Sequence, residues 1–209
     1  MAKILIADDH AIVRSGLRQI LINEPDLEVA GEAQNGAEVL DLIRRERWDV
    51  LVLDVGMPGR SGIETLREVK RERSALPVLI LSIYPEDQYA VRAIRAGASG
   101  YLTKDSAPDE LVRAIRKVLR GGKYVSETIT ARLFQALEDA NLLPHELLSD
   151  REYQVLCLIA SGRTITEIAG DISLSVKTVS TYRVRLLEKM RMKTNAELTH
   201  YAIKNNLTP

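Results

Sequence analysis

The stretch VLVLDVGMPG, residues 50–59, decides the fold of this chain. Its first four residues are all apolar and show no alternation, so both faces of the strand must be covered, as in a parallel sheet between helices. The apolar run stops at Asp54, and a Met-Pro-Gly loop follows. Asp54 therefore lies at the carboxyl end of a strand, where ligands bind in open α/β sheets.

A second apolar run, residues 4–7, ends in two acids, Asp8 and Asp9. If this strand is a neighbour of the first, three carboxylates converge at one edge of the sheet, where like charges suppress each other's ionisation. A hard divalent cation such as Mg²⁺ would resolve the conflict, because it takes oxygen ligands and keeps several waters. The alternative is that the acids cap strand ends or begin helices.

The bulk composition is that of a soluble globular protein. The 209 residues allow one large or two small domains, with 45% hydrophobic and 28% charged residues. Residues 1–3 lead directly into a strand without a signal peptide, and no apolar run approaches the roughly 18 residues of a membrane span. We therefore expect a cytoplasmic protein without a membrane partner. The single cysteine, Cys157, excludes an internal disulfide and is predicted in a helix core.

The zero net charge hides a basic C-terminal region. Residues 149–209 carry nine Lys and Arg against six Asp and Glu. Within residues 177–193 only Glu188 opposes a cluster of six cations: Lys177, Arg183, Arg185, Lys189, Arg191 and Lys193. Such a stripe on one helix is typical of nucleic-acid binding. A solvated helix face is the alternative.

Strand and helix patterns alternate five times between residues 3 and 120. Buried strands are predicted at residues 4–7, 27–33, 50–54, 78–82 and 101–103. Amphipathic helices follow each of them; one ends at Gly97 and the last opens at Pro108. Five such βα units predict an α/β fold with a doubly wound, five-stranded parallel sheet.

Two more polar residues fall at strand ends in this scheme. Ser82 ends the fourth strand and Lys104 follows the fifth, so both would reach the edge that carries the three acids. A carboxylate nucleophile needs a metal and a cation to neutralise an incoming phosphoryl group, and a hydroxyl can bind one of its oxygens.

Residues 2–121 resemble the receiver domains of two-component response regulators, whose fold is flavodoxin-like and CheY-like. The resemblance is carried by Asp8-Asp9, Asp54 with Met57-Pro58-Gly59, Ser82, Tyr101 and Lys104. It implies that Asp54 accepts a phosphoryl group from a sensor histidine kinase. It also implies an Mg²⁺ ion held by Asp9, Asp54, the carbonyl of Gly56 and, through water, Asp8.

The resemblance further implies roles for three residues around the phosphoryl group. Lys104 would pair with it, Ser82 would move toward it, and Tyr101 would turn inward to fill the vacated space. Each has a structural alternative: a helix cap for the serine, packing for the tyrosine and a surface position for the lysine. Asp105 follows Lys104 here, where many receivers have a proline after a cis bond.

Two other classes of protein share some of these features. A phosphotransferase with an aspartyl nucleophile would need a substrate lid and a second acid, and the sequence indicates neither. A pseudo-receiver that binds DNA constitutively would normally lack one of the acids, which are all present. We therefore expect no enzyme, only self-phosphorylation and acyl-phosphate hydrolysis at Asp54.

Three segments are predicted: a receiver domain at residues 1–121, a linker with one helix at 122–147, and a small all-α domain at 148–209. The linker helix is expected at residues 127–140, and residues 141–148 show no regular pattern. Ser149 and Glu152 form a capping box that opens a helix in the last segment. A short helix at 164–170 and a longer one at 176–190, joined by a tight turn, indicate a helix-turn-helix.

The longer helix has two faces at 100 degrees per residue. Val179, Leu186 and Met190 share the face expected in the core. The opposite face carries Lys177 and Arg185, expected at DNA phosphates, and Ser180, Thr181 and Val184, expected at bases. An exposed valine suits a thymine methyl group, although scattered surface hydrophobicity is the alternative.

This segment resembles the LuxR-type helix-turn-helix of the NarL/FixJ class of response regulators. The matching stretches are LSDRE at 148–152, EIA at 167–169, SVKTVSTY at 175–182, Leu186 and Lys189-Met190. Tyr182 stands where this class often has histidine, and its contact with DNA is expected there. The last helix, 195–204, is similar to the one that pairs two such domains, which implies a homodimer on double-stranded promoter DNA. Phosphorylation of Asp54 would then free or dimerise the helix-turn-helix and so regulate transcription.

Overall fold

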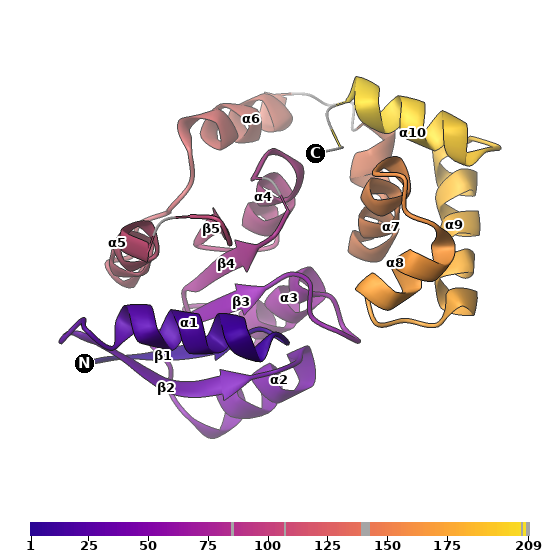
Figure 1. Cartoon of the computed structure of the whole chain (residues 1–209). Coiled ribbons are helices and arrows are strands. Elements are labelled where there is room, and N and C mark those ends of the chain that lie inside the picture. Colours follow the sequence, from indigo (N-terminus) through magenta and orange to yellow (C-terminus); the bar gives the residue numbers. More distant parts are fainter. Residues whose placement is uncertain (85, 107, 139–142, 206, 208–209) are drawn as a thin grey trace. The chain divides into compact units, whose positions relative to one another are not determined.

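The structure, a computed structural model, describes residues 1–84, 86–106, 108–138, 143–205 and 207. It contains two compact units, Met1–Glu127 and Thr128–Pro209, here called the N-terminal and C-terminal units. Figure 1 shows the course of the chain through both. The boundary between the units falls inside the predicted linker, at the start of its helix.

The N-terminal unit is built on a parallel sheet with the strand order β2-β1-β3-β4-β5. The strands are β1 (Ala2–Ala7), β2 (Leu27–Ala33), β3 (Val50–Asp54), β4 (Val78–Ser82) and β5 (Gly100–Thr103). The strands β1 and β3 are neighbours, with Ala7 opposite Leu53. Asp8 and Asp54 directly follow this pair, so the convergence of their strand ends is confirmed.

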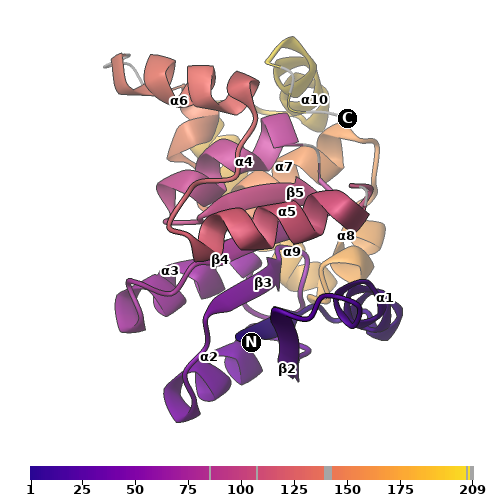
Figure 2. The ribbon, with the colours of Figure 1, turned by 90° about the vertical axis from the view of Figure 1, so that its left-hand side faces the viewer.

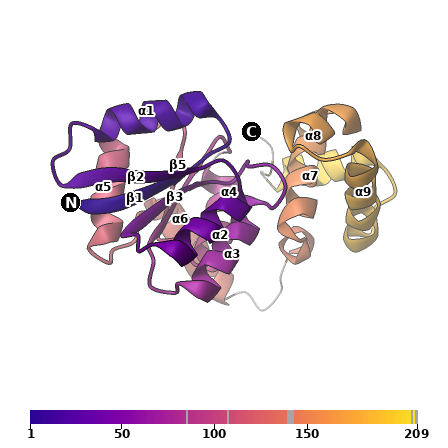
Figure 3. The same cartoon turned by 90° about the horizontal axis from the view of Figure 1, so that it is seen from below.

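Helices cover both faces of the sheet, as a doubly wound fold requires (Figures 2 and 3). The helices α1 and α5 lie on one face, and α2, α3 and α4 lie on the other. Their bounds are α1 (Ala11–Leu21), α2 (Gly36–Arg45), α3 (Gly62–Glu72), α4 (Glu86–Arg95) and α5 (Pro108–Leu119). The predicted fold class is confirmed.

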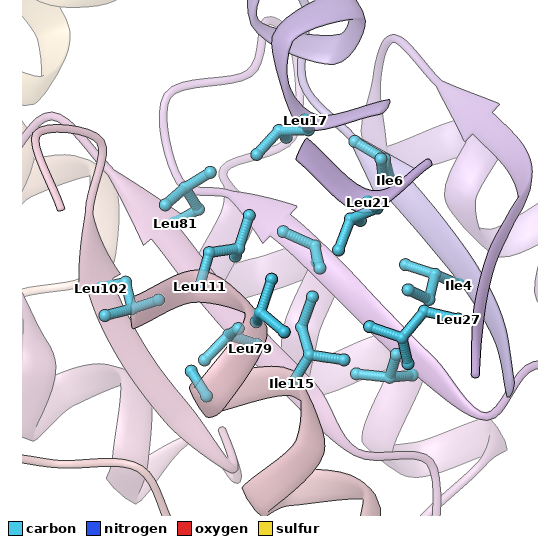
Figure 4. Close-up of a cluster of buried hydrophobic side chains, with 14 of the residues drawn as sticks. Ile4, Ile6, Leu17, Leu21, Leu27, Leu79, Leu81, Leu102, Leu111 and Ile115 are labelled. Atoms are coloured by element: carbon cyan, nitrogen blue, oxygen red, sulfur yellow. The ribbon is translucent and has the colours of Figure 1, made fainter. Parts of the chain in front are cut away.

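A cluster of buried aliphatic side chains joins α1 and α5 to the sheet (Figure 4). Alternate strand residues contribute to this face, because side chains of a strand point to opposite sides in turn. The labelled members are Ile4, Ile6, Leu17, Leu21, Leu27, Leu79, Leu81, Leu102, Leu111 and Ile115. The remaining strand side chains, such as Leu51 and Ile80, are buried as well. Both faces of the central strands are therefore covered, which explains their unbroken apolar sequence.

A close backbone approach at Gly62 positions the loop after β3. The Gly62 amide donates to the carbonyl of Val55 at 3.1 Å, and Ser61 and Glu64 form a capping box at the start of α3. A Cβ atom at Gly62 would lie only 2.4 Å from the carbonyl oxygen of Asp54. Glycine therefore allows α3 to begin directly against the end of β3 and keeps the loop compact beside Asp54.

The C-terminal unit is helical within the residues described. Its elements are α6 (Glu127–Glu138), η1 (Pro144–Leu147), α7 (Asp150–Ala160), α8 (Ile165–Asp171), α9 (Val176–Met190) and α10 (Asn195–Lys204). The ranges predicted for the last two helices are confirmed. The predicted end of the linker helix, at residues 139–140, lies outside the described residues. Residues 144–147, expected to be irregular, form a 3₁₀ turn in which His145 Nδ1 lies 2.9 Å from the Tyr201 hydroxyl of α10.

The capping box and the core face predicted for this unit are both present. Ser149 caps α7, with its side chain accepting from the Glu152 amide. Val179, Leu186 and Met190 of α9 are buried, as is Cys157 of α7. The turn between α8 and α9 contains Ser173 with a φ of 52°, a left-handed conformation that the sequence did not indicate. Among the helices in the described ranges, none combines the length and apolar character needed to cross a bilayer.

Candidate functional site

The carboxyl ends of β1, β3, β4 and β5 bring four predicted site residues to one edge of the sheet. Lys104 Nζ lies 2.6 Å from Asp8 Oδ2 and 3.0 Å from Asp54 Oδ2. The Lys104 amide donates to the carbonyl of Ser82 at 2.7 Å, which ties the loop after β5 to the end of β4. Strands that are far apart in sequence thus place the lysine between two acids.

The Asp54 carboxylate is buried and incompletely neutralised. It is 3% exposed, and its Oδ1 accepts no hydrogen bond from the residues that the structure describes. Burial raises the pKa of Asp54; Lys104 opposes this shift and Asp8 adds to it. Burial alone would lower the pKa of Lys104, but Asp54 and Asp8 raise it above its ordinary value. The lysine is therefore charged, and one ammonium faces more than one carboxylate.

The acids form a cluster with the composition of a metal site. One ligand atom from each of Asp8, Asp9, His10 and Asp54 lies within 4.8 Å of all the others. Three carboxylates and one lysine leave a negative excess, and Asp54 Oδ1 is a buried acceptor that no described residue reaches with a donor. These features fit a hard divalent cation. The backbone of Gly56 runs close by, since a Cβ there would lie 3.2 Å from Asp54 Oδ2.

Two residues at this edge, His10 and Arg14, were not predicted from the sequence. His10 Nδ1 lies 2.9 Å from Asp9 Oδ1 and 3.2 Å from Asp8 Oδ1. The buried Arg14 donates to the carbonyl of Asp8 at 2.8 Å and, through Nε, to Glu32 at 3.0 Å. A signal existed for His10, which directly follows the acid pair. Arg14 stands one helical turn after His10, and only the folded chain shows that it supports the β1–α1 loop.

Ser82 and Tyr101 are both buried near the site. The Ser82 hydroxyl accepts from the Tyr84 amide at 3.1 Å, and the Tyr101 hydroxyl donates to the Tyr84 carbonyl at 2.8 Å. Burial raises the pKa of Tyr101, so it stays protonated as a donor. The resemblance implied that Tyr101 turns inward on phosphorylation. In this structure the tyrosine side chain is already inside, 2% exposed.

The predicted DNA-contact residues lie on α9, the longer helix of the α8–α9 pair (Figure 1). Lys177, Thr181, Val184 and Arg185 are exposed, and Val184 is 50% exposed, whereas Ser180 and Tyr182 are half-buried. The Thr181 hydroxyl donates to the Lys177 carbonyl at 3.0 Å, so its oxygen keeps its lone pairs for accepting further hydrogen bonds. The helix therefore presents a basic face with one apolar side chain on it.

Comparisons with known proteins match both parts of the chain. Residues 4–116 match the response regulator receiver domain family, and residues 146–202 match the luxR family of bacterial regulatory proteins. The response regulator UvrY of Escherichia coli K12 is 36% identical over 209 residues, covering 99% of this chain and 96% of UvrY. The response regulator GacA of Pseudomonas aeruginosa is 36% identical over 211 residues, with 99% and 98% covered.

Solved structures give the same result. RcsB of Salmonella enterica serovar Typhimurium, bound to the promoter rprA with the phosphomimetic BeF₃⁻, matches with a TM-score of 0.63 and 26% identity, covering 96% of this chain and 98% of RcsB. A LuxR-family response regulator from Aurantimonas matches with a TM-score of 0.60 and 36% identity, covering 66% of this chain and 99% of that one. The chain therefore belongs to the two-component response regulators of the NarL/FixJ class, which join a receiver domain to a LuxR-type helix-turn-helix.

Proposed function

We propose that this response regulator works in the cytoplasm, where it accepts a phosphoryl group on Asp54 from a sensor histidine kinase and regulates transcription by binding promoter DNA through α9. The observation that carries the proposal is the buried Asp54 carboxylate, with Lys104 Nζ 3.0 Å from one oxygen and no hydrogen bond from the described residues to the other.

One carboxylate oxygen of Asp54 is the nucleophile. As its bond to phosphorus forms, the bond between phosphorus and the donor's imidazole nitrogen breaks, and the electron pair leaves with that nitrogen. Lys104 stays charged next to Asp54 and neutralises the phosphoryl oxygens that arrive there. The Ser82 hydroxyl, at the end of β4, turns to bind one of them. Tyr101 occupies the space behind it and holds the loop through the Tyr84 carbonyl.

A bound Mg²⁺ ion would supply positive charge that offsets the acids and the incoming phosphoryl group. Asp9, Asp54 and the Gly56 carbonyl would hold it, with Asp8 acting through water. Asp8 also accepts the Lys104 ion pair at 2.6 Å, so this carboxylate orders the lysine. Arg14 holds the carbonyl of Asp8 and thereby fixes the loop that carries these acids.

The basic face of α9 enters the major groove of double-stranded DNA. Lys177 and Arg185 bind phosphates, Ser180, Thr181 and Val184 touch base edges, and Tyr182 adds a contact at the rim of the helix. Two chains pair through α10 and read two half-sites. Solved structures of RcsB, one bound to a promoter and one of two dimers bound to two parallel DNAs, support this assignment through the family.

The decisive experiment replaces the phosphoacceptor. Asp54→Asn removes the nucleophilic oxygen with little change in shape, so incubation with acetyl phosphate and Mg²⁺ should give no phosphorylated species on a phosphate-affinity gel. The matched control is Asp105→Asn, an exposed aspartate two residues after β5, which should be labelled like the unmodified chain. Labelling of Asp54→Asn at the normal rate would remove Asp54 from this role.

The link to DNA is tested with the same pair of variants. Duplexes are first selected from a random library by the phosphorylated full-length chain. Acetyl phosphate should then tighten binding of those duplexes by the unmodified chain and by Asp105→Asn, but not by Asp54→Asn, in fluorescence anisotropy. A chain that binds equally with and without phosphodonor would contradict regulation by phosphorylation, while leaving DNA binding itself intact.

A further inference from the structure

We propose that His10 is a direct ligand in the metal site beside Asp54, and that its imidazole makes the site prefer Mn²⁺ over Mg²⁺. The inference rests on the proposed function, because it concerns the same acidic cluster. It adds a nitrogen ligand to a set of oxygen ligands and assigns a specificity role to a residue that the mechanism above does not use.

The geometry around His10 is that of neighbouring ligands. Its Nδ1 lies 2.9 Å from Asp9 Oδ1 and 3.2 Å from Asp8 Oδ1. In an octahedral shell with metal–ligand bonds of about 2.1 Å, adjacent ligand atoms are about 3.0 Å apart and opposite ones about 4.2 Å apart. One ligand atom from each of the four side chains, Asp54 included, lies within 4.8 Å of the others. A single ion can therefore reach Asp9, His10 and Asp54 with small adjustments, while Asp8 stays close enough to act through a water.

The backbone already holds His10 at this position. Its amide donates to Asp8 Oδ1 at 2.8 Å, and this backbone hydrogen bond does not depend on the orientation of the imidazole ring. The side chain itself is 62% exposed and is not fixed by packing. The ring can therefore turn to bring Nδ1 onto an ion without displacing core side chains.

A second observation points to a ligand at the cluster. Asp54 is 3% exposed and its Oδ1 accepts no hydrogen bond from the described residues. Such a buried acceptor is costly unless something compensates it. Lys104 pairs with Asp8 and with the other oxygen of Asp54. A cation in the cluster would engage the remaining oxygen and leave the lysine in place.

The chemistry of the ligand set decides which cation binds best. Mg²⁺ favours oxygen ligands and retained waters, whereas imidazole suits first-row transition ions. A neutral imidazole replaces a water in the shell without adding negative charge. Replacement of His10 should therefore weaken Mn²⁺ binding more than Mg²⁺ binding, and the ratio of the two affinities should report the nitrogen ligand.

The test measures metal binding rather than phosphorylation. Free Mn²⁺ is followed by electron paramagnetic resonance in titrations of the unphosphorylated full-length chain, and Mg²⁺ affinity is obtained by competition. His10→Ala should lower the Mn²⁺ affinity about tenfold and the Mg²⁺ affinity less than twofold. Pulsed spectra of the Mn²⁺ complex should show a directly bound ¹⁴N nucleus, which His10→Ala removes.

Two controls separate the possible failures. His200→Ala removes an exposed histidine of α10 and should change neither affinity. Asp9→Asn should abolish binding of both ions. If Asp9→Asn binds normally, the acidic site of the proposed function is wrong. A different result would overturn only the role of His10. In that case Asp9→Asn does not bind the ions, His10→Ala keeps the original ratio of Mn²⁺ to Mg²⁺ affinity, and the Mn²⁺ complex of the unmodified chain shows no directly bound ¹⁴N nucleus.

A positioning role for His10 has a different signature. If Nδ1 only orients Asp9 by a hydrogen bond, the losses for Mn²⁺ and Mg²⁺ should be equal and His10→Gln should restore both, since an amide can still donate. That pattern would also overturn the inference.

Discussion

Two acidic side chains of this chain have opposite electrostatic environments. Burial raises the pKa of Asp54 and outweighs the opposing effect of Lys104. Burial also acts on Glu152, but the Lys189 ammonium at 2.7 Å and the Ser149 amide at 2.8 Å lower its pKa below the ordinary value. Burial therefore disfavours the charged form of Asp54, whereas the charged form of Glu152 is stabilised and joins the start of α7 to α9.

Glu152→Gln should lower the free energy of unfolding of the C-terminal unit at pH 7 by about 1 kcal/mol, because the partly exposed ion pair with Lys189 is lost. A carboxyl group whose pKa is lowered in the folded state stabilises that state at pH values above its unfolded pKa, about 4.5. This contribution disappears as the pH falls through the folded pKa. Urea unfolding followed by circular dichroism should therefore show the difference at pH 7 and its decline below about pH 4.5.

The control for this prediction is Glu167→Gln. Glu167 closes the capping box of α8 with Thr164, as Ser149 and Glu152 do for α7, but within the described ranges it forms no ion pair with a lysine. Glu167→Gln should lower the free energy of unfolding by less than Glu152→Gln does. Equal costs for the two variants would show that the capping box, and not Lys189, accounts for the effect.

Ser173 is a second residue with a measurable consequence. Its φ of 52° is a left-handed conformation that costs about 1 kcal/mol for a residue with a Cβ. Ser173→Gly should therefore raise the melting temperature of the C-terminal unit. Ser161→Gly is the control: its φ is −78°, and its hydroxyl donates to the Cys157 carbonyl at 2.9 Å. That change should lower the melting temperature instead.

At the scale of the element, α9 divides into a buried face and a basic face. Val179, Leu186 and Met190 pack into the C-terminal unit, while Lys177, Val184 and Arg185 stay exposed. One helix thus serves both stability and recognition, because a period of 3.6 residues separates the two sets of side chains. Substitutions on the basic face should change DNA affinity without unfolding the unit.

Arg185→Ala tests the phosphate contact expected on this face. Each phosphate that is neutralised releases counterions, so the slope of log affinity against log salt should shrink by about 0.9 when one contact is lost. The measurement is fluorescence anisotropy with the selected duplex over a range of salt concentrations. Arg47→Ala removes the same charge from an exposed position of the N-terminal unit and should leave the slope unchanged. Equal slopes for both variants would place Arg185 away from the phosphates.

At the scale of the whole molecule, each unit has its own hydrophobic core. The N-terminal core joins the sheet to its helices, and the C-terminal core contains Leu186. The single tryptophan, Trp48, belongs to the N-terminal unit, and its Nε1 donates to the Leu42 carbonyl at 3.1 Å. Its fluorescence therefore reports the unfolding of one unit, whereas circular dichroism reports both.

Leu186→Ala should destabilise the C-terminal unit by about 2–5 kcal/mol, since it removes a fully buried side chain and leaves a cavity. The helical circular dichroism signal should be lost at a lower temperature, while the midpoint of thermal unfolding followed by Trp48 fluorescence should not change. Leu79→Ala in β4 is the reciprocal variant and should shift the Trp48 midpoint. A shared shift for both probes in Leu186→Ala would show that the two cores unfold together.

Local patterns alone predicted the five βα units, the helices at 176–190 and 195–204, and the capping box at Ser149, because periodicity and cap chemistry are written in neighbouring residues. They also predicted that Asp8, Asp54, Ser82 and Lys104 lie at strand ends, since an apolar run that stops at a polar residue marks where a buried strand leaves the core.

Only the tertiary structure decided which strands are neighbours, and hence that Lys104 lies between Asp8 and Asp54. It also brought His10 to the acids and Arg14 beneath their loop, and it placed Tyr101 inside. Strand order and side-chain direction depend on contacts between segments distant in sequence, whose free energies no local pattern contains.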